Sequence, residues 1–303
     1  MTLVPKKNFS IKDLPSLITE TYKAWDEANP WRLSAVVAYY AVLSLPALLV
    51  IIINIVGAVW GAEIVQGRLT NEISSALGSD AAESIQVIIA ETQNEEKSLI
   101  STIVGIATLL FGATGVFYQL KISLNEIWKV KPNPNASFWK LVTDRARSFA
   151  FILVIGFLLL VSFVVTAGIS ALNDYIKKVL PDILLYFAYL LDFTLSIGII
   201  TVLFALMFRY LPDAKIQWKT VWKGALITAI LFVIGKSLLG LYFGAANPGS
   251  TYGAAGTIVL ILLWVSYSCL ILFFGAEFTF VYAKKYGFGT EPSKIATIDS
   301  TKS

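Results

Sequence analysis

Histidine is absent from the 303 residues, and cysteine occurs once, at Cys269. The lack of histidine removes the commonest general base and the usual ligands of zinc enzymes. A single cysteine can form neither an internal disulfide nor a cysteine-based metal cluster. We therefore expect no catalytic residues, no metal site, no cofactor and no enzymatic activity.

Charged residues are also scarce, at 15% of the chain, against about 25% in an ordinary soluble domain. Hydrophobic residues make up 56%, and the mean hydropathy is +0.72. The net charge of +4 comes from basic residues that cluster beside long apolar runs. Membrane lipids, including anionic headgroups, are therefore the expected partners of these residues, and nucleic acid is not.

The most informative stretch is the pair of apolar runs between Lys219 and Lys285. Each run exceeds 20 residues, which is enough to cross a hydrocarbon core of ~30 Å at about 1.5 Å per residue. The turn between the runs contains Pro248, Gly249 and Gly253 and no charged residue. It is too short for a soluble domain, so the stretch predicts an antiparallel helical hairpin.

The whole chain predicts an all-α, polytopic membrane protein with six transmembrane helices and amphipathic helices at the interface. The predicted spans are 34–60, 99–128, 149–172, 183–210, 220–244 and 256–283. The remaining parts are a cytoplasmic N-terminal segment at 1–33, an extracytoplasmic amphipathic insert at 61–97 within the membrane domain 34–285, and a disordered cytoplasmic tail at 286–303.

Two of these parts outside the spans have helical spacing of apolar residues. In the N-terminal segment, these residues are Leu14, Leu17, Ile18 and Trp25. They predict a short helix on the membrane surface, with a loosely ordered tail as the alternative. In the insert, they are Ile64, Leu69, Ile73 and Leu77, followed by Ile85, Ile88 and Ile89. They predict two amphipathic helices, and the acidic residues around them lack metal-ligand spacing.

Lysine and arginine are distributed unevenly among the segments outside the spans. The N-terminal segment, the links 129–147 and 209–223, and the tail carry four or five each, whereas the alternate links carry two, two and none. Basic residues are retained on the cytoplasmic side of a membrane. The count therefore predicts that both termini lie in the cytoplasm.

Polar residues within the spans are the candidates for a substrate or ion path. They are Asp192, Lys236, Glu277, Lys121, Asn54, Tyr39, Tyr40, Arg209 and Tyr252, with Pro46 as a hinge that kinks the first span. A charge at mid-bilayer costs about 2.5–3.5 kcal/mol and usually faces a bundle interior or a wet cavity. The alternative is that these residues only hold helices together.

Depth along the predicted spans indicates two pairings of charges. Asp192 and Lys236 lie at one depth below the outer boundary and are expected to form an ion pair, with separate snorkelling of Lys236 as the alternative. Glu277 lies at about the depth of Lys121, near the cytoplasmic side. We expect it to pair with Lys121 or Arg209, or to reach the cytoplasmic interface.

The chain resembles the YihY/BrkB family of bacterial inner-membrane proteins over roughly residues 20–285. The resemblance is carried by RLSAVVAYYAVLSLPALL in the first span, LNEIW at the end of the second, RYLP after the fourth, Gly235-Lys236 with Tyr242, Tyr252-Gly253, Leu263-Trp264, Tyr267 and Gly275-Ala276-Glu277. It implies six helices and two cytoplasmic termini in the inner membrane. Members were once labelled ribonuclease BN, and others were linked to serum resistance, lipid export and ion transport. Glu126 departs from the family pattern, which often has a basic residue there.

Three functions follow from this reading. The first is a transporter or lipid flippase-like protein that uses the intramembrane charges. The second is a membrane scaffold or accessory protein of the cell envelope, with the amphipathic insert as a partner surface. The third is a ribonuclease, which is disfavoured because histidine and carboxylate clusters are missing.

Overall fold

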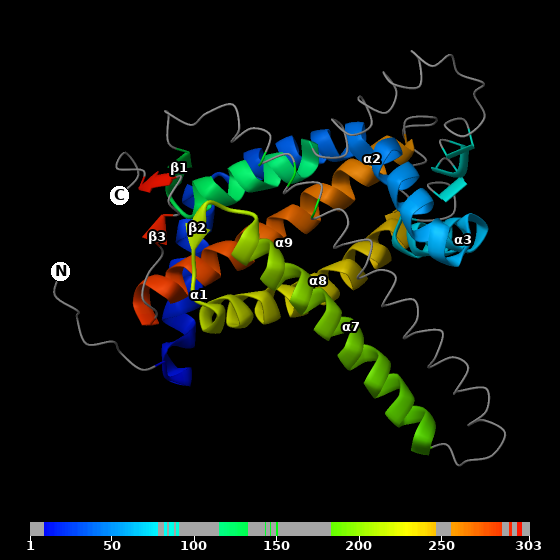
Figure 1. Cartoon of the computed structure of the whole chain (residues 1–303). Helices are drawn as coiled ribbons and strands as arrows, with labels where there is room; N and C mark the ends of the chain where they lie inside the picture. Colours follow the sequence, from blue (N-terminus) through cyan, green and yellow to red (C-terminus); the bar gives the residue numbers. More distant parts are fainter. Residues whose placement is uncertain are drawn as a thin grey trace.

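The computed structural model describes residues 9–77, 82–83, 85–87, 89–90, 115–132, 143, 146, 150, 183–246, 256–286, 291–292 and 296–298. Its helices are α1 (Leu14–Glu27), α2 (Pro30–Trp60), α3 (Ala62–Leu77), α7 (Ile183–Tyr210), α8 (Trp218–Ala246) and α9 (Gly256–Tyr286), together with the helical segment 115–127. Its strands are β1 (Val130–Pro132), β2 (Ala214–Lys215), β3 (Glu291–Pro292) and β4 (Ala296–Ile298). All four strands lie with α1 at one end of the helices, and α3 lies at the other (Figure 1).

Three of the described helices are long and apolar enough to cross a membrane: Phe193–Tyr210, Trp218–Phe243 and Gly256–Tyr286. On α8, an exposed apolar stripe recurs at helical spacing through Leu226, Ile230, Ile234, Leu238 and Leu241. Such a stripe is expected where a helix faces lipid. A mostly helical fold with candidate membrane spans is thus confirmed. The count of six spans stays a prediction, because span 149–172 and most of span 99–128 lie outside the described residues.

Helices α8 and α9 form the predicted hairpin and pack through small residues. A Cβ atom on Gly224 would overlap the Thr279 side chain, and one on Gly275 would overlap Thr228. Each threonine hydroxyl also donates to the glycine carbonyl four residues earlier in its own helix, at 2.7 Å. Two Gly-x-x-x-Thr motifs therefore face each other in antiparallel order and allow the close backbone approach typical of membrane helices.

Helix α1 packs against the C-terminal half of α9. Leu17 is fully buried in a cluster with Phe278 and Tyr282, and the Trp25 indole N–H donates to the Leu270 carbonyl at 3.2 Å. A helix at residues 14–27 is therefore present in place of the alternative, a loosely ordered tail. Its position on the membrane surface stays a prediction. Leu14, Ile18 and Tyr22 form an exposed stripe along the helix.

Helix α3 folds back onto the opposite end of the bundle. Val65, together with Ile85 and Ile89 of the same insert, is buried against apolar residues of α2, α8 and α9. The predicted amphipathic face is correct for Leu69 and Ile73, which pack against this cluster. Ile64, by contrast, is 53% exposed.

Two short strands lie in the tail after α9, where the sequence predicts disorder; the other residues after Tyr286 lie outside the described part of the chain. β4 pairs with β1, and β3 pairs with β2, both antiparallel. β1 lies in the link after segment 115–127, and β2 lies in the link between α7 and α8. Composition alone predicts disorder here, but exposed strand edges on these links supply backbone partners for the tail.

Candidate functional site

An ion pair is buried where segment 115–127 meets the link between α7 and α8. The Lys121 ammonium lies 3.1 Å from Asp213 Oδ2, and the two side chains are only 5% and 1% exposed. Asn125 Nδ2 donates to the same carboxylate oxygen at 3.1 Å, and Asn125 Oδ1 accepts the Asp213 backbone N–H at 2.8 Å. The carboxylate is therefore held by a charge and an amide at once.

Local geometry explains why these residues meet. Lys121 and Asn125 are four positions apart and so lie on one face of their helix. Asp213 follows Pro212, which ends α7 and turns the chain. The Arg209 guanidinium donates to the Ile216 carbonyl across this turn and lies 5.9 Å from the centre of the Trp218 ring. The link is thereby held in the shape that presents Asp213 to the helix.

Glu277 is the second buried carboxylate at this end, and its surroundings are different. The residue is 3% exposed and lies in α9, one of the candidate membrane spans. The neighbouring Ala276 carbonyl accepts a hydrogen bond from the Trp128 indole N–H at 3.1 Å. Across the part of the chain that the structure describes, the Glu277 carboxylate has no hydrogen bond and no ion pair.

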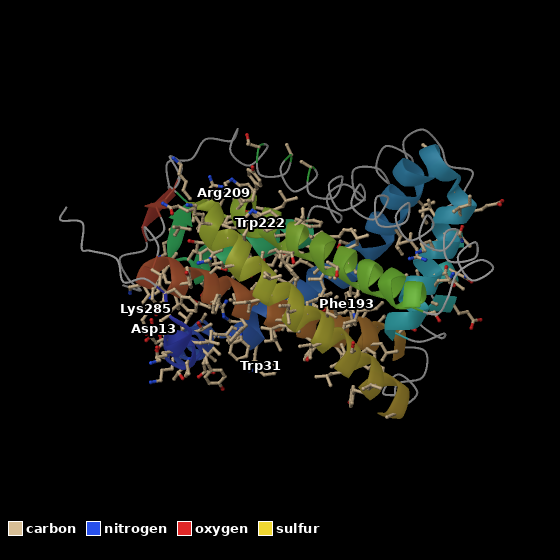
Figure 2. All side chains as sticks on the ribbon, turned by 90° about the horizontal axis from the view of Figure 1, so that it is seen from below. Asp13, Trp31, Phe193, Arg209, Trp222 and Lys285 are labelled. Carbon is tan, nitrogen blue, oxygen red and sulfur yellow. The ribbon has the colours of Figure 1, made fainter. Side chains whose placement is uncertain are left out.

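Glu277 lines a cavity of about 710 Å³ between α1, α9 and the end of segment 115–127. The carboxylates in the wall are Glu20, Glu27, Glu126 and Glu277. The ammonium groups in the wall are Lys23, Lys129, Lys284 and Lys285. The cavity lies at the end that Figure 2 marks with Asp13 and Lys285, away from α3.

Two of the carboxylates in the cavity wall, Glu20 and Glu126, form ion pairs. Lys285 Nζ lies 2.6 Å from Glu20 Oε1. Arg32 reaches the wall from α2, and its guanidinium lies 2.7 Å from Glu126 Oε1. Glu126, which departs from the family pattern, therefore serves as the partner of an arginine in this chain.

The predicted partners of Glu277 are wrong. Lys121 pairs with Asp213, and Arg209 is bound to the backbone of the α7–α8 link. The prediction used only the position of each residue along its predicted span, which says nothing about the direction in which a side chain leaves its helix. The prediction missed Asp213, although a carboxylate after Pro212 in a short link was a visible candidate for a buried lysine.

The other predicted site residues do not gather at this cavity. Tyr39 and Tyr40 are 59% and 37% exposed, and their rings contact each other edge to face. Lys236 is exposed on α8.

The remaining predicted site residues have side chains that lie outside the part of the chain that the structure describes. The side chains of Asp192, Asn54 and Pro46, and the whole of Tyr252, lie outside the described residues. The Asp192–Lys236 pair therefore stays a prediction. α2 is helical without a break across Pro46.

Comparison with known proteins identifies the family. The family described as Virulence factor BrkB matches residues 21–296. The chain belongs to the BrkB family. No solved structure matches this BrkB-family chain.

Several relatives are named UPF0761 membrane proteins. The protein from Mannheimia succiniciproducens is 26% identical over 274 residues, which cover 88% of this chain and 90% of the relative. The protein from Verminephrobacter eiseniae is 27% identical over 227 residues, and the match covers 73% of this chain but only 52% of the relative. These names and the apolar helices agree that the chain is an integral membrane protein.

Proposed function

We propose that this BrkB-family chain is a transporter or lipid flippase-like protein of the bacterial cytoplasmic membrane, and that Glu277 belongs to its substrate or ion path. The observation that carries the proposal is the buried Glu277 carboxylate, which lines a charged cavity and has no ion pair or hydrogen bond among the described residues. The proposal includes six spans with both termini in the cytoplasm.

A buried carboxylate without a partner lowers the stability of the fold, so structural carboxylates are normally paired. An unpaired one is therefore more easily explained by a functional role. Ionisable residues within membrane spans are typical of substrate and proton pathways. Asp213 meets the structural expectation, and Glu277 fits the functional one.

The charge distribution supports a cytoplasmic position for the cavity. Its wall includes α1 and the end of α9, and both flank the basic segments of the chain. Basic segments are retained in the cytoplasm. A group taken up by the cavity would then enter from the cytoplasmic face.

Liposomes containing the purified full-length chain test the proposal. We expect ion flux or lipid scrambling above that of empty liposomes, and we expect Glu277→Gln to abolish it. Glu63→Gln is the matched control, because Glu63 is exposed on α3 at the other end of the molecule. Folded protein without either activity would favour the alternative, a scaffold without a transport cycle.

The scaffold alternative uses the amphipathic insert as a partner surface. Part of the apolar face of this insert is buried within the protein, because Val65, Ile85 and Ile89 pack against α2, α8 and α9, while Ile64 stays exposed. We also propose that the chain is not a ribonuclease, since it has no histidine. Metal-dependent RNA cleavage that is lost when an acidic residue is replaced would overturn this part.

A further inference from the structure

Lys129, in the wall of the Glu277 cavity, has an unusual backbone conformation. Its φ is 55°, and in the described part of the chain only Asn29 shares a positive φ among residues other than glycine. Lys129 directly follows the last turn of segment 115–127, where its N–H donates to the Glu126 carbonyl at 3.2 Å. Glycine is the usual residue at this position because it adopts the left-handed conformation without strain. Lys129 occupies this strained conformation in place of a glycine, and a strained residue in the wall of a cavity points to a use for its side chain.

The cavity keeps charges of both signs after its ion pairs are counted. Glu20 and Glu126 are paired with Lys285 and Arg32. The wall residues without such a pair among the described residues are Glu27, Glu277, Lys23, Lys129 and Lys284. A ligand that carried only one sign would leave the charges of the other sign without a partner.

The charged residues of the cavity wall also differ in how far they are buried in the protein. Glu277 is buried and Lys129 is half-buried, whereas Glu27, Lys23 and Lys284 are exposed. The Lys129 ammonium attracts the Glu277 carboxylate, and the Glu27 carboxylate repels it. Lys129 and Glu277 nevertheless form no ion pair within 4.0 Å in the described residues. The volume of about 710 Å³ lies within the range of roughly 300–1,000 Å³ that is usual for small-molecule sites.

We propose that this cavity binds a zwitterionic group of the phosphoethanolamine class, with its ammonium on Glu277 and Glu27 and its phosphate on Lys129 and Lys284. Carboxylates accept hydrogen bonds from a primary ammonium, and lysine is a common phosphate ligand. The inference rests on the proposed function only in taking the cavity as the substrate site. The same chemistry occurs in a soluble metabolite and in a lipid headgroup.

Binding of soluble probes to the purified full-length chain in maltoside detergent tests the proposal by calorimetry. We expect phosphoethanolamine to bind at least tenfold more tightly than ethanolamine, which lacks the phosphate, and than glycerol phosphate, which lacks the ammonium. If ethanolamine or glycerol phosphate bound as tightly as phosphoethanolamine, the proposal of a zwitterionic ligand would be overturned.

Lys129→Gly is the decisive variant, because glycine relieves the backbone while it removes the ammonium. We expect at least tenfold weaker binding of phosphoethanolamine with an unchanged or higher melting temperature. Lys219→Ala is the matched control, since Lys219 is exposed at the start of α8 and does not line the cavity. Wild-type affinity in Lys129→Gly would contradict the proposal.

Nanodiscs separate the two sources of the ligand. If the natural ligand is a lipid headgroup, nanodiscs that contain phosphatidylethanolamine should weaken phosphoethanolamine binding relative to nanodiscs of phosphatidylglycerol alone. If it is a soluble zwitterion, the two affinities should agree. Binding of phosphoethanolamine without transport in liposomes would overturn the proposed transport function but not the proposed binding site. Transport that depends on Glu277, without phosphoethanolamine binding, would overturn only the proposed binding site.

Discussion

Asp213 and Glu277 are carboxylates buried at the same end of the bundle, with residue exposures of 2% and 3%. Asp213 is held by the Lys121 ammonium and the Asn125 amide. Glu277 instead faces a cavity, with no hydrogen bond or ion pair in the described portion of the chain. Two carboxylates with nearly equal burial therefore have different surroundings. The proposed division into a structural Asp213 and a functional Glu277 rests on their partners and not on burial.

The largest effect is expected from breaking the Asp213 cluster. Asp213→Asn and Lys121→Met should each lower the free energy of unfolding by about 3–5 kcal/mol, because each leaves a buried charge without its partner. The double variant should regain more than half of this loss. Folded yield after detergent extraction, measured by size-exclusion chromatography, checks both expectations. Single variants with wild-type yield would show that the cluster is not a structural element.

A smaller loss is expected where the hairpin positions Glu277. Gly275 lies two residues before Glu277 and against Thr228, so Gly275→Ala should push α8 and α9 apart and cost about 1–3 kcal/mol. Gly240→Ala is the matched control, because a Cβ there meets no atom within 4 Å. We expect a lower melting temperature for the first variant and an unchanged or higher one for the second. Equal shifts would contradict the close contact.

Glu277→Gln should change stability in the opposite direction from Asp213→Asn. A neutral amide costs less to bury than a carboxylate without a partner, so we expect stability to rise by about 1 kcal/mol. Thermal unfolding of the purified variant measures the change. A large loss of stability would mean that Glu277 holds the fold together, and the contrast between the two carboxylates would disappear.

The smallest effect is expected at the rim of the cavity. The side chains of Glu20 and Lys285 are 49% and 28% exposed, and exposed ion pairs contribute about 0.2–1 kcal/mol. A double-mutant cycle with Glu20→Ala and Lys285→Ala should give a coupling in this range that weakens with salt. A coupling as large as that of the buried cluster would show that the rim is as structural as Asp213.

Much of the architecture could be predicted from the sequence. The α8–α9 hairpin follows from two apolar runs of membrane length and a short turn without charge. The helix around Leu17 follows from the spacing of its apolar residues. These features are local, so a single sequence contains the information they need.

The candidate site could be predicted only in part. Glu277 stands out as a charge in an apolar run, but its surroundings depend on how distant segments dock. The Lys121–Asp213 pair depends on the shape of the α7–α8 link, which Arg209 holds through a backbone contact. The strained φ of Lys129 and the strands β3 and β4 depend on tertiary contacts as well. None of these leaves a periodic signal in the sequence.

The pairing of β3 and β4 has a consequence for the order of assembly. β1 and β2 are synthesised before α8 and α9, whereas their partners lie beyond α9. While the helices enter the membrane one after another, the edges of β1 and β2 have no strand to pair with. β3 and β4 reach them only after every described helix has been synthesised. These two strands, made after α9, therefore close this end of the protein, and a chain that stopped after α9 would reach the membrane with both edges still open.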